Sequence, residues 1–212
     1  WPPGHPYSRL YIGTEQDLDA VTLEGLREWF KTWYAPSNAV LVLAGNVTAA
    51  AAVEKVERYF GAIPPGPSMT RVKRWATMPR GPRRDIVYDS QLATAALTRT
   101  WSIPEAGVGS ADADYLELLA AVLNRQTSHL SRRLIVEEKV ASDVSVNLRK
   151  NEIGSQLTIR LTALAGVDLE YAERILQEEL ARVLKQGPAP DELQAVRMEQ
   201  VARMVSSIQS TA

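Results

Sequence analysis

The sequence predicts an α+β fold of two layers, in which helices pack on one face of a mainly antiparallel sheet. Three observations favour it. A helix–strand–helix pattern lies near the N-terminus, a stretch rich in proline, glycine and basic residues follows, and the remainder has the order β-β-α-α-β-β-α-α. Hydrophobic residues make up 45% of the 212 residues, which is enough apolar surface for a core.

The first pattern predicts a helix, a strand and a second helix in turn. Apolar residues recur at helical spacing from Leu23 to Tyr34, and Thr22 is placed to cap this helix. The unbroken apolar run at 39–44 predicts a strand buried on both faces. Thr48 can cap the second helix, and Gly61 ends it.

Residues 63–84 predict a linker, because they have no apolar period and many prolines and glycines. Its basic side chains have no acidic residue among them: Arg71, Lys73, Arg74, Arg80, Arg83 and Arg84. A nucleic-acid-binding segment would need more aromatic residues than Trp75 and a basic domain around it, whereas the chain's net charge is −1. A solvated connector is therefore the favoured interpretation, and a nucleic-acid partner is not expected.

The stretch after the linker begins with two predicted strands, 85–90 and 93–103. Helices are then expected at 111–123 and 129–139, and Ser110 and Ser128 stand where N-cap residues belong.

Alternating side chains next predict a hairpin. Val144, Val146 and Leu148 lead into a turn at 150–152, and the return strand occupies 153–161.

Two helices end the chain, one at about 168–186 and one from about Pro190. The last helix has one apolar face, formed by Leu193, Val196, Val201, Met204, Val205 and Ile208.

Residue chemistry alone predicts no catalytic centre in this chain. His5 and His129 are the two histidines, and neither has a second histidine at helical spacing with which to hold zinc. We expect both to be structural or solvated, and the neighbouring pairs Glu137-Glu138 and Glu178-Glu179 to be solvated helix faces. Without cysteine, the chain has neither disulfides nor thiolate metal sites.

The apolar runs are too short to cross a bilayer, so no transmembrane segment is expected. No leader peptide is visible at the start, which is not a methionine, and we therefore expect a piece of a longer protein.

The stretch HPYSRLYIGTEQDLDAVTLEGLREWFKTWYAPSNAVLVLAGNVT, followed by VERYFGAIP, resembles the insulinase-like zinc peptidases. This family includes pitrilysin and the mitochondrial processing peptidase. The matching residues are His5-Pro6-Tyr7, Gly13, Leu18, Thr22-Leu23, Phe30, Tyr34, Pro36, Asn38-Ala39, Gly45 and Tyr59-Phe60-Gly61. The later segment SHLSRRLIVEEKVASDVSV looks like a diverged copy of the family's second-domain motif.

The resemblance implies a processing-peptidase-like α+β fold and a division into parts. Residues 1–62 would be the C-terminal tail of a first, peptidase domain, and 63–84 the linker. Residues 85–212 would be a second, inactive peptidase-like domain that is incomplete. The family's zinc-binding motif H-x-x-E-H lies upstream of the segment that contains His5, so zinc would belong to the full-length protein and not to this chain.

The resemblance also implies a substrate clamp, which this chain lacks. In the family an arginine, and a tyrosine seven residues later, grip the backbone of the substrate. Ile135 and Ser142 occupy these two positions here, so the resemblance supplies no catalytic, metal-binding or substrate-binding residue.

Two functions remain open. The chain is either an inactive part of a zinc metalloendopeptidase that acts on extended or unfolded peptides, or part of the family's non-catalytic partner subunit. Both imply a homologous subunit in a homo- or heterodimer, and the bacterial relatives favour a periplasmic or envelope location.

The family's internal symmetry leads to a final expectation. The helix–strand–helix unit at 22–61 resembles the tail that the 85–212 domain lacks. We therefore expect the strand at 39–44 to pair with the sheet of that domain, either within one chain or exchanged between two chains.

Overall fold

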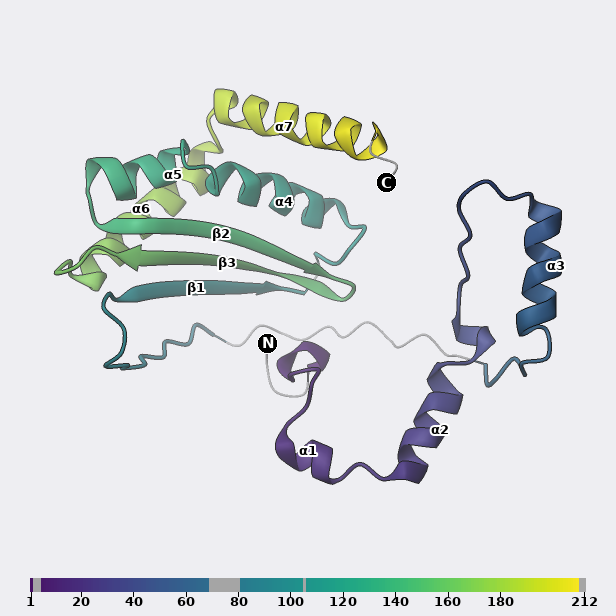
Figure 1. Ribbon diagram of the computed structural model, residues 1–212. Helices are drawn as coiled ribbons and strands as arrows, with labels where there is room; N and C mark the ends of the chain where they lie inside the picture. Colours follow the sequence, from purple (N-terminus) through teal and green to yellow (C-terminus); the bar gives the residue numbers. More distant parts are fainter. Residues whose placement is uncertain (2–4, 69–80, 105, 210–212) are drawn as a thin grey trace. The chain divides into compact units, whose positions relative to one another are not determined.

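The computed structural model describes residues 1, 5–68, 81–104 and 106–209 (Figure 1). The chain divides into two compact units. One is Pro3–Arg74, and the other is Trp75–Ala212 together with Trp1–Pro2.

The N-terminal unit is built from short helices. Its main elements are α1 (Glu15–Asp19), α2 (Leu23–Trp33) and α3 (Ala49–Phe60), with single 3-10 turns at Pro6–Ser8 and Pro36–Asn38. The hydroxyls of Thr22 and Thr48 accept hydrogen bonds from the first turns of α2 and α3, which confirms the two predicted caps.

Helix α1 is absent from the sequence-based prediction. It is stabilised by a reciprocal capping box, in which Thr14 and Asp17 each accept a hydrogen bond from the other's backbone N–H. The pattern T-x-x-D was therefore the signal for it.

The predicted strand at 39–44 is not formed. These residues are extended at Ala39 (φ −119°, ψ 147°) but belong to no sheet, and Val40 is 91% exposed. These residues and the sheet lie in different units, so the expectation that the two pair stays a prediction. An apolar, β-branched run specifies an extended backbone, but a strand also needs a neighbour to receive its hydrogen bonds.

The C-terminal unit contains a three-stranded antiparallel sheet. Its strands are β1 (Ala96–Ile103), β2 (Ala141–Asn151) and β3 (Gly154–Ala163), in the spatial order β1-β3-β2. The predicted hairpin is confirmed, although its turn lies at Glu152-Ile153, later than predicted. The predicted strand at 85–90 is wrong, because these residues make no ladder with β1.

Four helices follow the predicted order: α4 (Ala111–Leu123), α5 (His129–Ser131), α6 (Leu169–Gln186) and α7 (Pro190–Gln209). Ser110 and Ser128 are N-caps, as predicted. Instead of one α-helix over 129–139, α5 runs into η3 (Arg132–Glu137), a π-helical turn. The helices lie over one face of the sheet (Figure 1), which confirms the two-layer α+β fold.

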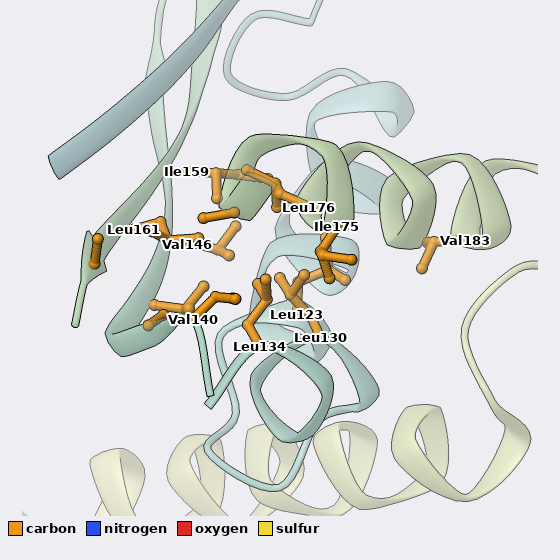
Figure 2. Close-up of a cluster of buried hydrophobic side chains, with 14 of the residues drawn as sticks. Leu123, Leu130, Leu134, Val140, Val146, Ile159, Leu161, Ile175, Leu176 and Val183 are labelled. Carbon is orange, nitrogen blue, oxygen red and sulfur yellow. The ribbon is translucent and has the colours of Figure 1, made fainter. Parts of the chain in front are cut away.

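The core lies between this face and the helices (Figure 2). Strands β2 and β3 contribute Val144, Val146, Ile159 and Leu161, and α6 contributes Ile175 and Leu176. On the other face of the sheet the residues are polar, which matches the alternation along the strands: Thr98, Thr100, Ser102, Ser145, Asn147, Gln156, Thr158, Arg160 and Thr162.

Only part of the apolar face of α7 is buried. Val196 is buried, whereas Val201, Met204, Val205 and Ile208 are exposed.

Candidate functional site

The two clamp positions lie on a stretch of irregular backbone between α5 and β2. The N–H of Glu138 donates to the carbonyl of Arg133, five residues earlier, at 2.9 Å, and this bond closes the π turn. Lys139 follows with φ 52°, in the left-handed region. The pairing of β2 with β3 then shifts register between Ala141 and Asp143. π turns and bulges each occur often at functional sites.

The side chains at the clamp positions do not form a polar pair. Ile135 is half-buried and packs against the core. Ser142 is exposed, and its hydroxyl donates to the carbonyl of Thr162 at 3.2 Å. Neither side chain carries a cation or a phenol, so neither can form a charge-assisted hydrogen bond with a substrate carbonyl.

A network of ion pairs fastens the π turn to α6. Arg133 lies 2.6 Å from Glu178, 3.7 Å from Glu179 and 4.0 Å from Glu138. The phenol of Tyr171 also donates to Glu138 at 3.0 Å, and this bond raises the pKa of Tyr171. The network gives the irregular backbone a fixed position on the helix layer.

Glu179 corrects the expectation that the Glu178-Glu179 pair is solvated. The Glu179 side chain is only 3% exposed and accepts two hydrogen bonds from Arg182, at 2.6 and 2.9 Å. These bonds raise the pKa of Arg182. The sequence signal for this burial is the position of Glu179 on the apolar stripe of α6, between Leu176 and Val183. A carboxylate on such a stripe is tolerated only when it is paired.

The two histidines lie in different units. His5 is buried, and its Nδ1 accepts a hydrogen bond from the N–H of Tyr7 at 3.0 Å, which caps the first turn. Burial lowers the pKa of the His5 imidazole. His129 is exposed at the start of α5, and its backbone N–H donates to Glu192 at 2.7 Å.

The donor set does not fit a zinc ion. Nowhere in the part of the chain that the structure describes do three or more histidine, aspartate, glutamate or cysteine side chains gather closely enough to hold a metal. The Nδ1 of His5 is also engaged as a cap. A catalytic zinc takes three protein ligands, so no chemical step is assigned to a metal on these residues.

The basic cluster of the predicted linker is only partly visible. Arg71, Lys73, Arg74 and Arg80 lie outside the described residues. Arg83 pairs with Asp85 at 2.9 Å, and Arg84 pairs with Glu173 of α6 at 2.7 Å. Among the described residues 5–68, 81–104 and 106–209, no helix is long and apolar enough to cross a membrane.

Comparison with known proteins gives a family for this fold. Residues 20–200 match the model of the family described as the peptidase M16 inactive domain. Among curated proteins, zinc protease PqqE of Helicobacter pylori is 23% identical over 220 residues, which cover 98% of this chain and 47% of that protein.

Two solved structures share the fold. A protease from Helicobacter pylori superposes with a TM-score of 0.78 at 18% identity, over 94% of this chain and 48% of that one. The peptidase M16 inactive domain from Pseudomonas fluorescens gives 0.75 at 18% identity, over 96% and 48%. The chain thus spans about half the length of these proteins.

Proposed function

The chain belongs to the M16, or insulinase-like, peptidase family, and from this membership we propose that it is the non-catalytic part of a zinc metalloendopeptidase that cleaves extended or unfolded peptides. The observation that carries the proposal is the match of residues 20–200 to the M16 inactive domain, together with the shared fold.

In this proposal the chain combines parts of two domains. Residues 85–212 are an inactive peptidase-like domain, and residues 1–62 are the end of the domain before it, joined by the linker at 63–84. The division into compact units near Arg74, within that linker, supports this assignment. The zinc ion would supply a Lewis acid and an activated water when bound elsewhere in the longer protein.

The residues of this chain would act as scaffold and not as chemical groups. Arg133 and its carboxylate partners hold the π turn on α6, but Ile135 and Ser142 offer nothing to grip a peptide backbone. We therefore assign the gripping of substrate to a homologous subunit that carries an arginine and a tyrosine at these positions. Positioning of the substrate contributes much of the rate of catalysis, so the longer protein should cleave peptides slowly when no such partner is present.

The test uses the longer protein that contains this chain. Its zinc content and its hydrolysis of a quenched fluorescent peptide are measured alone and with a homologous subunit that bears the clamp. One zinc per chain, with activity that rises at least about tenfold on mixing, is the expected result. A zinc-free protein that only stimulates a zinc-bearing homologue would instead show the partner-subunit function.

A variant pair sharpens this test. Ser142→Tyr together with Ile135→Arg restores both clamp side chains, and Val136→Arg adds an arginine at an exposed neighbouring position as the matched control. The double variant should gain activity without a partner, and the control should not. Full activity of the unmodified protein on its own would refute the role given to the partner.

A further inference from the structure

The helix formed by α5 and η3 ends with one residue more than an α-helix would. The N–H of Glu138 donates to the carbonyl of Arg133 at 2.9 Å, across five residues. The N–H of Val140 donates to the carbonyl of Leu134 at 2.9 Å, across six. The equivalent bonds at the end of an α-helix each span one residue fewer. The carbonyl of Val140 also accepts from the N–H of Leu164 at 3.1 Å, directly after β3, so this longer helix end is joined to the sheet.

The charged side chains of this segment follow the same spacing. In the sequence RRLIVEE, Arg132 lies 2.9 Å from Glu137. Arg133 lies 4.0 Å from Glu138, so both pairs are five residues apart. Neighbours on an α-helix are three or four residues apart, so an α turn would break both pairs and bring only Arg133 and Glu137 together. Both pairs are partly exposed and contribute little on their own, so the π register needs a further support.

Helix α6 supplies this support at both ends of the π bond. Arg133, whose carbonyl accepts the bond, has its guanidinium 2.6 Å from Glu178. Glu138, whose N–H donates the bond, accepts a hydrogen bond from the phenol of Tyr171 at 3.0 Å. Closing the turn as an α turn would rotate Glu138 by roughly 100° relative to Arg133, so only one of the two side chains could keep its partner on α6.

The two contacts on α6 have a fixed spacing. Tyr171 and Glu178 are seven residues apart, which places them two turns apart on the same face of the helix. Between them Leu176 is 0% exposed, so the core fixes the position of α6. The turn must therefore fit the helix, because the helix cannot move to fit the turn.

We propose that Tyr171 and Glu178 are positioning residues for the clamp segment, residues 132–142. They set the register of the π turn, and this register places residue 135 relative to residue 142. In this chain they support Ile135 and Ser142, so the scaffold of a clamp is present without the side chains that grip. All of these contacts lie within the C-terminal unit. The role rests on the proposed function in one respect, that positions 135 and 142 form the clamp.

Amide exchange of the 212-residue chain, followed by NMR, tests the hold on the turn. Tyr171→Phe removes only the phenol oxygen, and Glu178→Gln removes only the charge at the other end of the π bond. In each variant we expect the amides of Glu138 and Val140 to exchange at least about threefold faster relative to those of β3, because local opening breaks one interaction fewer. Tyr115→Phe, at an exposed tyrosine of α4, is the matched control and should leave this ratio unchanged.

Steady-state kinetics of the longer protein test the consequence for the clamp. In the protein with Ile135→Arg and Ser142→Tyr, adding Tyr171→Phe should raise KM at least about threefold and leave kcat almost unchanged, because a misplaced clamp binds substrate less well. A merely structural loss would lower the fraction of folded enzyme, and therefore kcat, without changing KM. Tyr115→Phe in the same background should change neither constant.

The two measurements distinguish this role from the proposed function. If the protein with Ile135→Arg and Ser142→Tyr stays inactive, positions 135 and 142 are not a clamp and the proposed function fails. The exchange of the Glu138 amide still decides in that case whether Tyr171 holds the turn. Unchanged exchange at Glu138 in both variants, or faster exchange with an unchanged KM, would overturn the proposal.

Discussion

Helices α2 and α6 are built from the same kinds of sequence signal, yet they end in different environments. Each begins at a capping side chain, Thr22 or Asp168, and each has an apolar stripe. In α6 the stripe is buried, and Leu176 is 0% exposed, whereas in α2 Leu26 is 53% exposed and no residue is buried.

The same contrast holds for the two units. The fifteen buried residues of the core cluster all come from the C-terminal unit, whereas in the N-terminal unit only His5 and Ala35 are buried among the described residues. Local signals are therefore enough to set where a helix begins and ends. A core requires in addition that the facing surface be part of the same folded unit.

The two units should differ most in the free energy of unfolding that is lost when one leucine in each is replaced by alanine. Leu176→Ala should lower the free energy of unfolding by about 2–5 kcal/mol, because it leaves a cavity in the core. Leu26→Ala on α2 should change it by less than about 0.5 kcal/mol. Urea unfolding followed by circular dichroism measures both, and equal effects would contradict the contrast between the units.

Replacing one glutamate by glutamine in each unit should give a smaller difference in the free energy of unfolding. Glu179→Gln removes the buried carboxylate that pairs with Arg182 and should lower the free energy of unfolding by about 1–3 kcal/mol. Glu28→Gln breaks the exposed pair with Lys31 and should cost no more than about 0.5 kcal/mol. Glu178→Gln, at the exposed neighbour of Glu179, is the control for changing charge on α6. A loss for Glu178→Gln as large as for Glu179→Gln would show that burial is not the cause.

Removing one N-cap residue in each unit should lower the stability of the whole unit in one case and only of a single helix in the other. Ser110→Ala removes the cap of α4 and should lower the stability of the C-terminal unit by about 1 kcal/mol. Thr48→Ala removes the equivalent cap of α3, so the amides of α3 should exchange faster while the unfolding of the C-terminal unit is unchanged. Amide hydrogen exchange distinguishes the two results. A shift in the unfolding of both units by Thr48→Ala would show that they fold together.

The smallest effect should be the pH dependence of the first turn. Burial lowers the pKa of His5 below its value in the unfolded chain, so protons bind the unfolded form more tightly. The cap on Tyr7 is present while His5 is neutral and is lost as the pH falls through the lowered pKa, because a protonated Nδ1 cannot accept. Protection of the Tyr7 amide should fall between neutral and acidic pH, and His5→Asn, a cap that does not titrate, should abolish this dependence. Unchanged protection in the wild type would contradict the prediction.

Much of the fold was predictable from the sequence because it depends on local patterns. Thr22, Thr48, Ser110 and Ser128 all cap the helices expected of them, and alternation in β2 and β3 identified the hairpin. The strands at 39–44 and 85–90 were predicted wrongly, since their apolar residues say nothing about whether a hydrogen-bonding neighbour is present.

The candidate site was less predictable. Ile135 and Ser142 could be placed by resemblance, but the π turn that carries Ile135 depends on contacts of Arg133 with α6, 45 residues away. The burial of Glu179 was visible in the spacing of the stripe on α6, but its pairing with Arg133 is a long-range contact.

The π turn also determines how the chain tolerates changes of length. A π turn holds about one residue more than an α turn, so Arg132–Glu137 behaves as a single-residue insertion within a helix. Deleting the exposed Val136 would let the turn close as an ordinary α turn, and the residues that follow would keep their positions. A deletion within β2 has no such turn to absorb it, and it moves the side chains beyond it to the opposite face of the sheet. The loss of one residue should therefore be tolerated in this turn and not in the strand that follows.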